Sequence, residues 1–344
     1  MIGTALACPD KFRGTLSAAA AAAAIARGLR SAGIEDVTEL PLADGGEGTL
    51  DVILAARGGA RRSTTVTGPL HDPVDAEWAM LGDGTAVIEM ARASGQGLVA
   101  VERRDPLEAS TRGTGELIAA ALRAGATRVV VGVGGSAATD GGLAALQALD
   151  WSLGGVPVTV ACDVRTMFLD AAAVFGPQKG ASAAQVGLLT RRLEHVAGLY
   201  RDRLGVDVSS WEGSGAAGGL AGGLAAIGAT IEPGFDAIAE IVGLETVLLE
   251  ADLVVTGEGK LDRTSFDGKV VGGVLALASD LGVEHCGVIA GQVTDDAREQ
   301  VAAVGAVTVL ALTDRVWHAG EAFGRAALLV EEAAVEIARL AGGA

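Results

Sequence analysis

The chain of 344 residues is long enough for two domains or for one large α/β domain, and half of its residues are apolar. Its formal net charge of −17 repels nucleic acid and anionic membrane surfaces, so neither is expected as a partner. Three widely separated cysteines, and the absence of an apolar run of membrane-spanning length without glycine or charge, favour a cytoplasmic protein.

The N-terminal region alternates strands with helices. The apolar stretch Thr4–Cys8 predicts a buried strand, and the alanine-rich stretch Ser17–Ala32 predicts a helix because alanine has the highest helix propensity. A short strand is expected at Val37–Leu42, and the glycine-rich segment that begins at Asp44 opens a helix that runs to Arg57. This order predicts an α/β fold with a parallel sheet.

The pattern changes in the middle of the chain. Three short apolar segments, separated by Gly, Pro and Asp turns, predict an antiparallel meander. These strands are expected at Thr64–Thr67, Glu77–Leu81 and Ala86–Met90. Beyond them we expect helices at Gly115–Ala124 and Ala184–Leu199 and strands at Arg128–Val133 and Val156–Cys162.

Strand–helix alternation returns near the C-terminus. Strands are expected at Leu253–Thr256, Gly287–Ala290 and Val307–Leu312, and helices at Val270–Leu281 and Glu321–Leu340. The simplest architecture joins the two ends of the chain into one doubly wound parallel-sheet domain, with a second α/β domain inserted. The predicted domains are residues 1–64 with 240–344, and the mixed α/β insertion 65–239.

Glycine and charged residues gather directly after the predicted strands, where open parallel sheets bind ligands. Any one of these residues is typical of a turn, so the accumulation over seven strand ends is the signal. The polar residues at these ends are Asp10, Lys11, Arg13, Asp44, Glu47, Ser136, Asp140, Asp163, Glu258, Lys260, Asp262, Thr313 and Asp314.

The segment Gly132–Gly142, with the sequence GVGGSAATDGG, joins a predicted strand to an apolar helix. Its glycines let several backbone N–H groups face one anion, so the segment is a candidate phosphate cradle, with a plain tight turn as the alternative. It is neither a Walker A loop nor a dinucleotide fingerprint, which would need glycine at Ala137.

The acids and lysines of these motifs fit magnesium-assisted phosphoryl transfer. Magnesium often uses one or two carboxylates plus substrate phosphates, and a further carboxylate can accept the proton of a hydroxyl nucleophile. Lys179 lies within FGPQKG and Lys269 follows Asp267-Gly268, and both can offset phosphate charge. Each of these residues has a structural alternative, and Asp44 could simply cap a helix.

Seven blocks of sequence occur in order along almost the whole chain. They are PDKFRGTLSA at 9–18, ADGGEGT at 43–49, GTGELI at 113–118, GGSA at 134–137 with DGG at 140–142, ACDV at 161–164, FGPQKGA at 175–181, and TGEG at 256–259 with Gly268-Lys269. Together these blocks resemble the bacterial glycerate kinase family, of the glycerate 2-kinase type found in glucarate and glyoxylate metabolism.

The resemblance implies a two-domain α/β enzyme that uses ATP and Mg²⁺ to phosphorylate D-glycerate, giving 2-phosphoglycerate. A monomer or homodimer is expected. Roles are assigned to the matching positions from residue chemistry, and we expect the side chains to converge on one cleft. The expected catalytic residues are Asp44, Asp163, Glu258 and Lys179, with Asp163 and Glu258 as metal ligands; the ATP-binding residues are Gly134, Gly135, Ser136, Asp140 and Lys269; and the substrate-binding residues are Asp10, Arg13 and Glu47.

Departures from the family pattern leave two alternatives. Ala138 and Thr139 stand in place of Thr and Asn, and Thr166–Phe168 replaces Asn-Pro-Leu. One alternative is a kinase for another small hydroxy acid. The other is a non-catalytic paralogue that binds a nucleotide or a sugar acid, although a pure binder has little need for so many retained acids.

Overall fold

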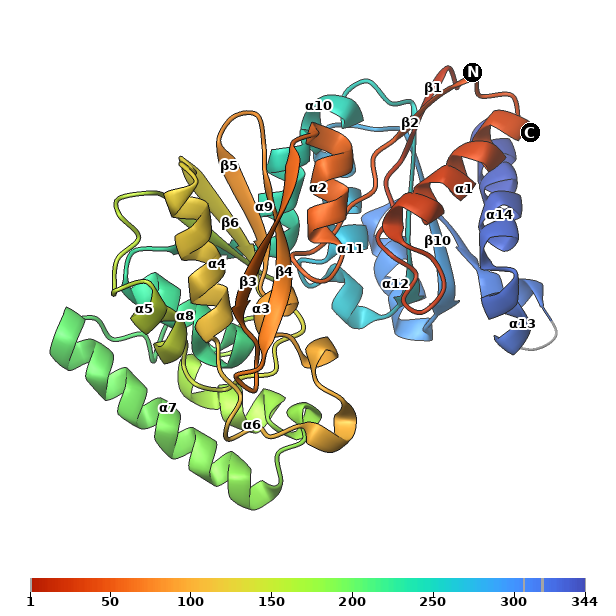
Figure 1. Ribbon diagram of the computed structural model, residues 1–344. Coiled ribbons are helices and arrows are strands. Elements are labelled where there is room, and N and C mark those ends of the chain that lie inside the picture. The colour runs from red at the N-terminus through yellow and green to blue at the C-terminus, as the bar shows by residue number, and fades with distance from the viewer. Residues whose placement is uncertain (1, 306, 317–318, 344) are drawn as a thin grey trace. The chain divides into compact units, whose positions relative to one another are not determined.

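The computed structural model describes residues 2–305, 307–316 and 319–343, which form two compact units, each with its own β-sheet (Figure 1). The first unit contains Met1–Asp44, Asp51–Ala56 and Ile238–Ala344, and the second contains Gly45–Leu50 and Arg57–Ala237. Both sheets carry helices between parallel strands, so the protein has the α/β fold with parallel sheets that the sequence predicts.

The sheet of the first unit has five parallel strands in the order β11-β10-β9-β1-β2. The chain first adds β2 on one side of β1 and later adds β9, β10 and β11 on the other side. The winding therefore reverses between β1 and β9, and ligands of such sheets bind beyond the carboxyl ends of the strands at this switch point. The strands are β1 (Thr4–Ala7), β2 (Asp36–Glu39), β9 (Leu253–Leu261), β10 (His285–Val293) and β11 (Val307–Ala311).

The helices predicted at Ser17–Ala32 and Val270–Leu281 lie at nearly the predicted positions in the first unit. The Ser17 side chain caps α1 (Ala18–Ser31) by accepting a hydrogen bond from Ala20 N at 3.2 Å. The small alanine face of α1 lies against α14 (Ala326–Ala341) (Figure 1), and both helices contribute to one apolar core. The further helices are α10 (Leu244–Leu248), α11 (Val270–Asp280), α12 (Asp295–Val304) and α13 (Ala319–Gly324), with α2 (Thr49–Arg57) and α9 (Gly234–Val242) at the boundaries of the units.

The prediction of one continuous helix over Glu321–Leu340 is wrong. Two helices, α13 and α14, occupy this region, and Arg325 between them has φ −119° and ψ 14°, outside the helical range. Gly324 precedes the break, and glycine has low helix propensity because it loses the most backbone entropy on folding.

The sheet of the second unit has six strands in the order β3-β4-β5-β6-β7-β8. The predicted antiparallel meander is confirmed, because β3, β4 and β5 pair antiparallel, whereas β5 to β8 pair parallel. The strands are β3 (Ala60–Thr67), β4 (Pro73–Met80), β5 (Thr85–Glu89), β6 (Arg128–Gly132), β7 (Val158–Cys162) and β8 (Thr230–Pro233). The helices are α3 (Ala91–Ser94), α4 (Arg112–Arg123), α5 (Leu143–Ala148), α6 (Ala171–Phe175), α7 (Ala183–Leu204) and α8 (Leu220–Ala226).

The glycine-rich segment before α8 packs directly against the segment that precedes α5. A Cβ atom at Gly218 would lie 2.1 Å from the Ala138 carbonyl oxygen, and Gly218 has φ +67°, so only glycine fits this position. Gly218 O also accepts a hydrogen bond from Gly141 N at 3.0 Å. These glycines therefore allow close packing, which fixes the backbone on either side of Asp140.

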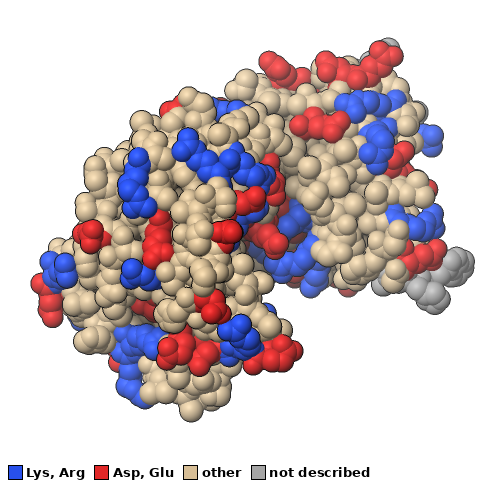
Figure 2. Space-filling model, viewed as in Figure 1, with Lys and Arg blue, Asp and Glu red and all other residues tan. Residues whose placement is uncertain are grey.

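Surface charge is distributed rather than segregated. Over the face drawn in Figure 2, basic and acidic side chains are interspersed, so the net charge of −17 does not form one continuous acidic surface there. Within the part of the chain that the structure describes, none of the helices is both long and apolar enough to cross a bilayer.

Candidate active site

Two carboxylates lie side by side at the switch point of the first unit. The backbone beyond β1 continues along β9, because Cys8 N donates to Val255 O and Asp10 N donates to Gly257 O, both at 2.9 Å. This pairing places Asp10 beside Glu258, near the carboxyl end of β9. Both residues are among the predicted site residues, and they lie where a parallel sheet of this topology binds its ligands.

The carboxylate of Asp10 is largely buried, and its pKa reflects both burial and the charges around it. Burial raises the pKa of Asp10 to about 6, the charge of Lys11 opposes that shift, and the charge of Asp44 adds to it. Lys11 N donates to Asp10 Oδ1 at 2.6 Å, and the Lys11 ammonium lies 4.0 Å from the same oxygen. The pKa shift links the predicted residues Asp10 and Asp44 electrostatically within one unit.

Glu258 has an unsatisfied oxygen. Its Oε1 atom is buried and has no hydrogen-bond partner among the described residues. Burial raises the pKa of Glu258 to about 7, a hydrogen bond from Ser265 lowers it, and the charge of Asp10 raises it. A buried acceptor without a partner costs free energy, so this oxygen is suited to a cation or to a hydroxyl group of a ligand.

Lys269 supplies a positive charge near these acids. It is the residue before the first turn of α11, and its ammonium donates to Thr264 Oγ1 at 2.9 Å. The Lys269 charge acts on Glu258, whose pKa it lowers. A lysine at the N-terminus of an eleven-residue helix is suited to an anion, because the helix dipole and the ammonium have the same sign there.

Arg13 lies in the turn that follows Asp10. Phe12 N donates to Leu16 O at 2.9 Å and Leu16 N donates to Phe12 O at 3.0 Å, which closes this turn. The Phe12 side chain is buried and anchors the turn in the core of the first unit, whereas Arg13 is exposed. The structure thus leaves the predicted substrate-binding role of Arg13 as a prediction.

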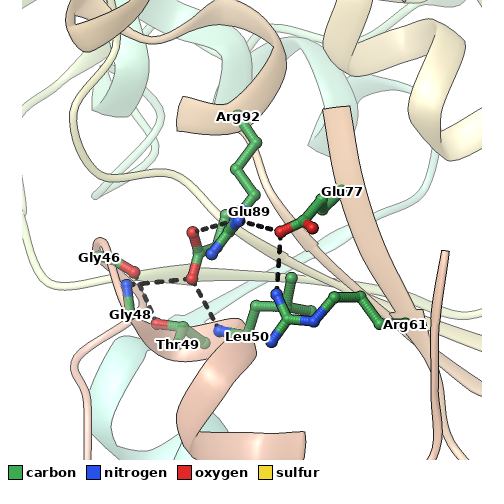
Figure 3. A network of polar contacts seen from close by, with 8 residues as sticks. All are labelled: Gly46, Gly48, Thr49, Leu50, Arg61, Glu77, Glu89 and Arg92. Carbon is green, nitrogen blue, oxygen red and sulfur yellow. Dashed lines mark hydrogen bonds and ion pairs between the residues drawn. The ribbon is translucent and has the colours of Figure 1, made fainter. Parts of the chain in front are cut away.

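In the second unit, a buried acid holds the loop 45–50 that carries Glu47 (Figure 3). Glu89 Oε1 accepts hydrogen bonds from Gly48 N at 3.0 Å and from Leu50 N at 2.7 Å. Its other oxygen, Oε2, accepts from Arg92 Nε at 2.9 Å, and the residue is 2% exposed. Both oxygens of this carboxylate are therefore satisfied, and its role is to position the loop.

The same network extends to the surface of the meander (Figure 3). Arg92 also contacts Glu77, with 2.6 Å between Nη1 and Oε2, and Arg61 Nη1 lies 2.9 Å from that same oxygen. The sequence analysis did not identify Glu89. The signal was present, since an acid at the end of the fully buried strand Thr85–Glu89 needs a partner.

The loop 45–50 also lies directly against the parallel strands of the second unit. A Cβ atom at Gly132, the last residue of β6, would lie 2.4 Å from the Gly45 carbonyl oxygen. A Cβ atom at Gly45 would lie 2.9 Å from the carbonyl oxygen of Ala161 in β7. The glycines of both motifs therefore allow backbone to approach backbone, at the strand ends that precede Gly134 and Asp163.

The predicted phosphate cradle is paired with the segment after α3. Gln96 N donates to Gly135 O and Ala137 N donates to Ser94 O, both at 2.9 Å, so Ser136 is buried in a short antiparallel bridge. The helix that follows, α5, has only six residues. The contribution of a helix dipole at this position is therefore smaller than the sequence suggests.

Asp140 is held by three groups of the second unit. It accepts hydrogen bonds from Thr111 N at 2.9 Å, from Thr111 Oγ1 at 2.9 Å and from Gly142 N at 3.0 Å. Burial raises the pKa of Asp140, whereas these hydrogen bonds and the charge of Lys179 lower it. The sequence analysis missed Thr111, because a buried threonine at a helix start has no distinctive pattern.

Lys179 is a buried cation. It is 3% exposed, and its ammonium donates to the Ala138 carbonyl and lies 3.4 Å from Thr139 Oγ1. Burial lowers the pKa of Lys179 to about 7, and the charge of Asp140 opposes this shift. Lys179 is therefore a buried group of the second unit and not a solvated surface lysine.

The predicted site residues are therefore divided between the two units. Asp10 and Glu258 belong to the first unit and Lys179 belongs to the second. The convergence of these side chains on one cleft stays a prediction. The first unit holds Asp10, Arg13, Asp44, Glu258 and Lys269, and the second holds Glu47, Gly134, Gly135, Ser136, Asp140, Asp163 and Lys179.

A family model described as the glycerate kinase family matches residues 5–155 and 149–342 of the chain. The chain is 40% identical to the glycerate kinase of Bacillus subtilis, over 96% of this chain and 95% of that relative. It is 41% identical to the glycerate 2-kinase of Escherichia coli, over 84% of this chain and 85% of the relative.

A solved structure has the same fold over the whole chain. It is a crystal structure titled as a glycerate kinase 2 from Salmonella typhimurium LT2, with a TM-score of 0.83 and 32% sequence identity. The similarity covers 100% of this chain and 99% of that one.

Proposed function

The chain belongs to the glycerate kinase family, and we propose that it transfers the terminal phosphate of ATP to the 2-hydroxyl of D-glycerate, giving 2-phosphoglycerate. The observation that carries this proposal is the pair of buried acids, Asp10 and Glu258, at the switch point of a parallel sheet. The relative from Escherichia coli that is named glycerate 2-kinase supports the position of transfer. The two compact units are, on this proposal, the two domains of the enzyme.

Magnesium fits the acids of the first unit. No cluster of three or more His, Cys, Asp or Glu side chains suited to a metal occurs among the described residues, but magnesium commonly uses only one or two carboxylates and takes further ligands from phosphates and water. Glu258 Oε1 has no hydrogen-bond partner among the described residues, and burial and the charge of Asp10 both raise the pKa of Glu258, so a cation would offset the charge of both acids. Glu258 would hold the ion, and the role of Asp163, a residue of the second unit, as a further ligand stays a prediction from the sequence. When bound, magnesium neutralises charge on the transferring phosphate.

The remaining groups of the first unit have roles in moving the proton and in binding phosphate. A carboxylate, Asp44 in our assignment, accepts the proton of the glycerate hydroxyl. The hydroxyl oxygen then forms a bond to the γ-phosphorus, while the bond from that phosphorus to the β,γ-bridging oxygen breaks and its electron pair leaves with ADP. Lys269 lies at the start of α11, where its ammonium offsets charge on the phosphate oxygens.

The second unit supplies backbone and positioning groups in this proposal. Gly134, Gly135 and Ser136 bind ATP, Asp140 orders that segment, and Glu47 contacts the substrate from the loop that Glu89 holds. We infer a cytoplasmic location from the requirement for ATP. The enzyme acts as a monomer or homodimer.

The test is to incubate the purified protein with ATP, Mg²⁺ and a panel of hydroxy acids while ADP release is followed. Turnover with D-glycerate, with 2-phosphoglycerate resolved from 3-phosphoglycerate by phosphorus NMR, supports the proposal. Turnover only with another acid would replace the substrate. An absence of turnover together with ATP-dependent thermal stabilisation would indicate a non-catalytic binder.

A further inference from the structure

The turn that follows β9 in the first unit carries a buried serine, Ser265, that none of the assigned roles uses. It belongs to the short 3₁₀ helix Arg263–Phe266 and is 1% exposed. Its backbone N–H donates to Asp262 O at 2.9 Å, and its Oγ accepts a hydrogen bond from Asp262 N at 3.0 Å. These two hydrogen bonds fix the position of the Ser265 side chain within the turn.

The helix α11 packs closely on this turn. A Cβ atom at Gly272 would lie 2.6 Å from the Phe266 Cα atom and 2.7 Å from the Ser265 carbonyl oxygen, so glycine allows the helix to approach the turn. Phe266 packs against an apolar core that includes Leu261 and Val271. The turn is therefore held between the end of β9 and the helix, and a group on such a packed element keeps its geometry.

The hydroxyl proton of Ser265 is available to Glu258. A serine hydroxyl has one proton to donate, and the Ser265 oxygen already accepts from the backbone of Asp262. Ser265 hydrogen-bonds the Glu258 side chain, and since Glu258 Oε1 has no partner among the described residues, this hydrogen bond goes to Oε2. One oxygen of the carboxylate is thus held, while the other stays open to a ligand.

Glu258 has a physical need for this hydrogen bond, because a second acid lies beside it. The charge of Asp10 acts against an ionised Glu258, since like charges repel. Glu258 is only partly buried, so its carboxylate is free to turn towards solvent when nothing holds it. A hydrogen bond that keeps the two acids together before a cation arrives reduces the cost of ordering them when it binds.

We propose that Ser265 is a positioning residue of the divalent-cation site, whose hydroxyl holds Glu258 Oε2 and thereby directs Oε1 to the ion. The inference rests on the proposed kinase function and gives the turn after β9 a role in it. Ser265 does not contact the ion and acts through Glu258. Hydrogen bonds to metal-binding side chains orient them, and loss of such a bond typically lowers metal affinity by about 10- to 100-fold.

The experiment measures the affinity of the purified protein for Mn²⁺, which replaces Mg²⁺ and whose unbound form is counted by electron paramagnetic resonance. Ser265→Ala is expected to weaken Mn²⁺ binding by about 10- to 100-fold, and Ser265→Thr, which keeps the hydroxyl, is expected to bind more tightly than Ser265→Ala. Thr264→Val is the matched control, because the Thr264 hydroxyl lies in the same turn and donates to Asp262 Oδ1 at 2.7 Å. It should leave Mn²⁺ affinity unchanged, and an equal loss in Thr264→Val would contradict the proposal.

A double-mutant cycle separates positioning from a contribution to the fold. Ser265→Ala also removes the acceptor of the Asp262 N–H group, so its melting temperature is expected to fall slightly whatever Glu258 does. In a Glu258→Gln background, Ser265→Ala should weaken Mn²⁺ binding no further, because the carboxylate that the hydroxyl positions is already gone. The same loss of affinity with and without Glu258 would show that Ser265 acts only through the fold.

Failure of the kinase proposal can be separated from failure of this one. If the wild type phosphorylates no acid, weaker Mn²⁺ binding by Ser265→Ala still supports the positioning role while the kinase proposal fails. Turnover of D-glycerate with the same dependence on Mg²⁺ concentration in wild type and Ser265→Ala would keep the kinase and remove the role of Ser265. A wild type that binds no Mn²⁺, or binds it no better than Ser265→Ala does, would overturn that role as well.

Discussion

Glu89 and Glu258 are both acids at or near the carboxyl end of a parallel strand, yet their surroundings differ. Glu89 is 2% exposed and both of its oxygens accept hydrogen bonds, from Gly48, Leu50 and Arg92. Glu258 has a buried oxygen with no partner among the described residues, and burial raises its pKa to about 7. Glu89 therefore stabilises the fold through its hydrogen bonds, whereas Glu258 has an oxygen that is available to a ligand.

The largest effect on stability is expected from substitution of Glu89, the acid whose two oxygens both accept hydrogen bonds. Glu89→Ala leaves two backbone N–H groups and Arg92 without their acceptor, so we expect the free energy of unfolding to fall by about 3–5 kcal/mol. Urea denaturation measures it. Glu77→Ala is the control, since Glu77 is 41% exposed and its ion pairs with arginine contribute only about 0–1 kcal/mol. Equal losses in the two variants would remove the distinction between Glu89 and a surface acid.

Substitution of Glu258, the acid with an unsatisfied oxygen, is expected to raise the free energy of unfolding, whereas substitution of Glu89 lowers it. The pKa of Glu258 is raised in the folded protein from 4.5 to about 7, so this group stabilises the fold least when it is ionised, and its contribution declines as pH rises through that window. Glu258→Gln removes this decline and should raise the free energy of unfolding at pH 8 by about 1–2 kcal/mol, after allowance for solvent screening. Denaturation at pH 5 and pH 8 tests it, and a loss of stability at pH 8 would show that Glu258 is a structural acid.

A smaller effect is expected where a hydroxyl supports a site acid. Thr111→Val removes the hydrogen bond from Thr111 Oγ1 to Asp140 in a buried setting and should cost about 1–2 kcal/mol. The matched control is Thr65→Val. The Thr65 hydroxyl donates to Asp75 at the surface, with 2.5 Å between the oxygens. Unfolding measurements should show little change in Thr65→Val, and parity between the two variants would argue against a supporting role for Thr111.

The smallest effect concerns pH and the buried lysine. Because burial lowers the pKa of Lys179 to about 7, the ammonium that is expected to offset phosphate charge is lost as pH rises, and kcat/KM should fall by a few-fold between pH 7 and pH 8.5. Asp140, Arg104 and Asp105 are the charged groups nearby, and Asp140 opposes the shift. Lys179→Met should abolish this fall in kcat/KM, and an identical pH profile in that variant would exclude Lys179 as its source.

Much of the fold could be predicted because its signals are local. Alanine propensity marks α1 with its Ser17 cap, and alternating apolar segments mark the meander of β3, β4 and β5. Local signals failed where tertiary context decides. The strand β8 is four residues long, ends at Pro233 and was not predicted, and the break at Arg325 between α13 and α14 has no proline to mark it.

The candidate site could be predicted only in part for the same reason. Glycine and acidic residues directly after an apolar strand form a local pattern in the sequence. This pattern identified Asp10 and Glu258. Thr111 lies in a sequence, ASTRGTG, that resembles any helix start, and its hydrogen bond to Asp140 becomes visible only when the surrounding chain is in place. Glu89 shows the intermediate case, in which an acid in an apolar strand signals a need for partners without naming them.

The most direct test of the central claim is the rate of ADP release by Glu258→Gln with ATP, Mg²⁺ and D-glycerate, relative to wild type. The account predicts a loss of about 100-fold or more in a protein that melts no lower than wild type, because Gln keeps the shape of Glu258 but lacks the negative charge that binds magnesium strongly. A Glu258→Gln variant that turns over D-glycerate at close to the wild-type rate would contradict it.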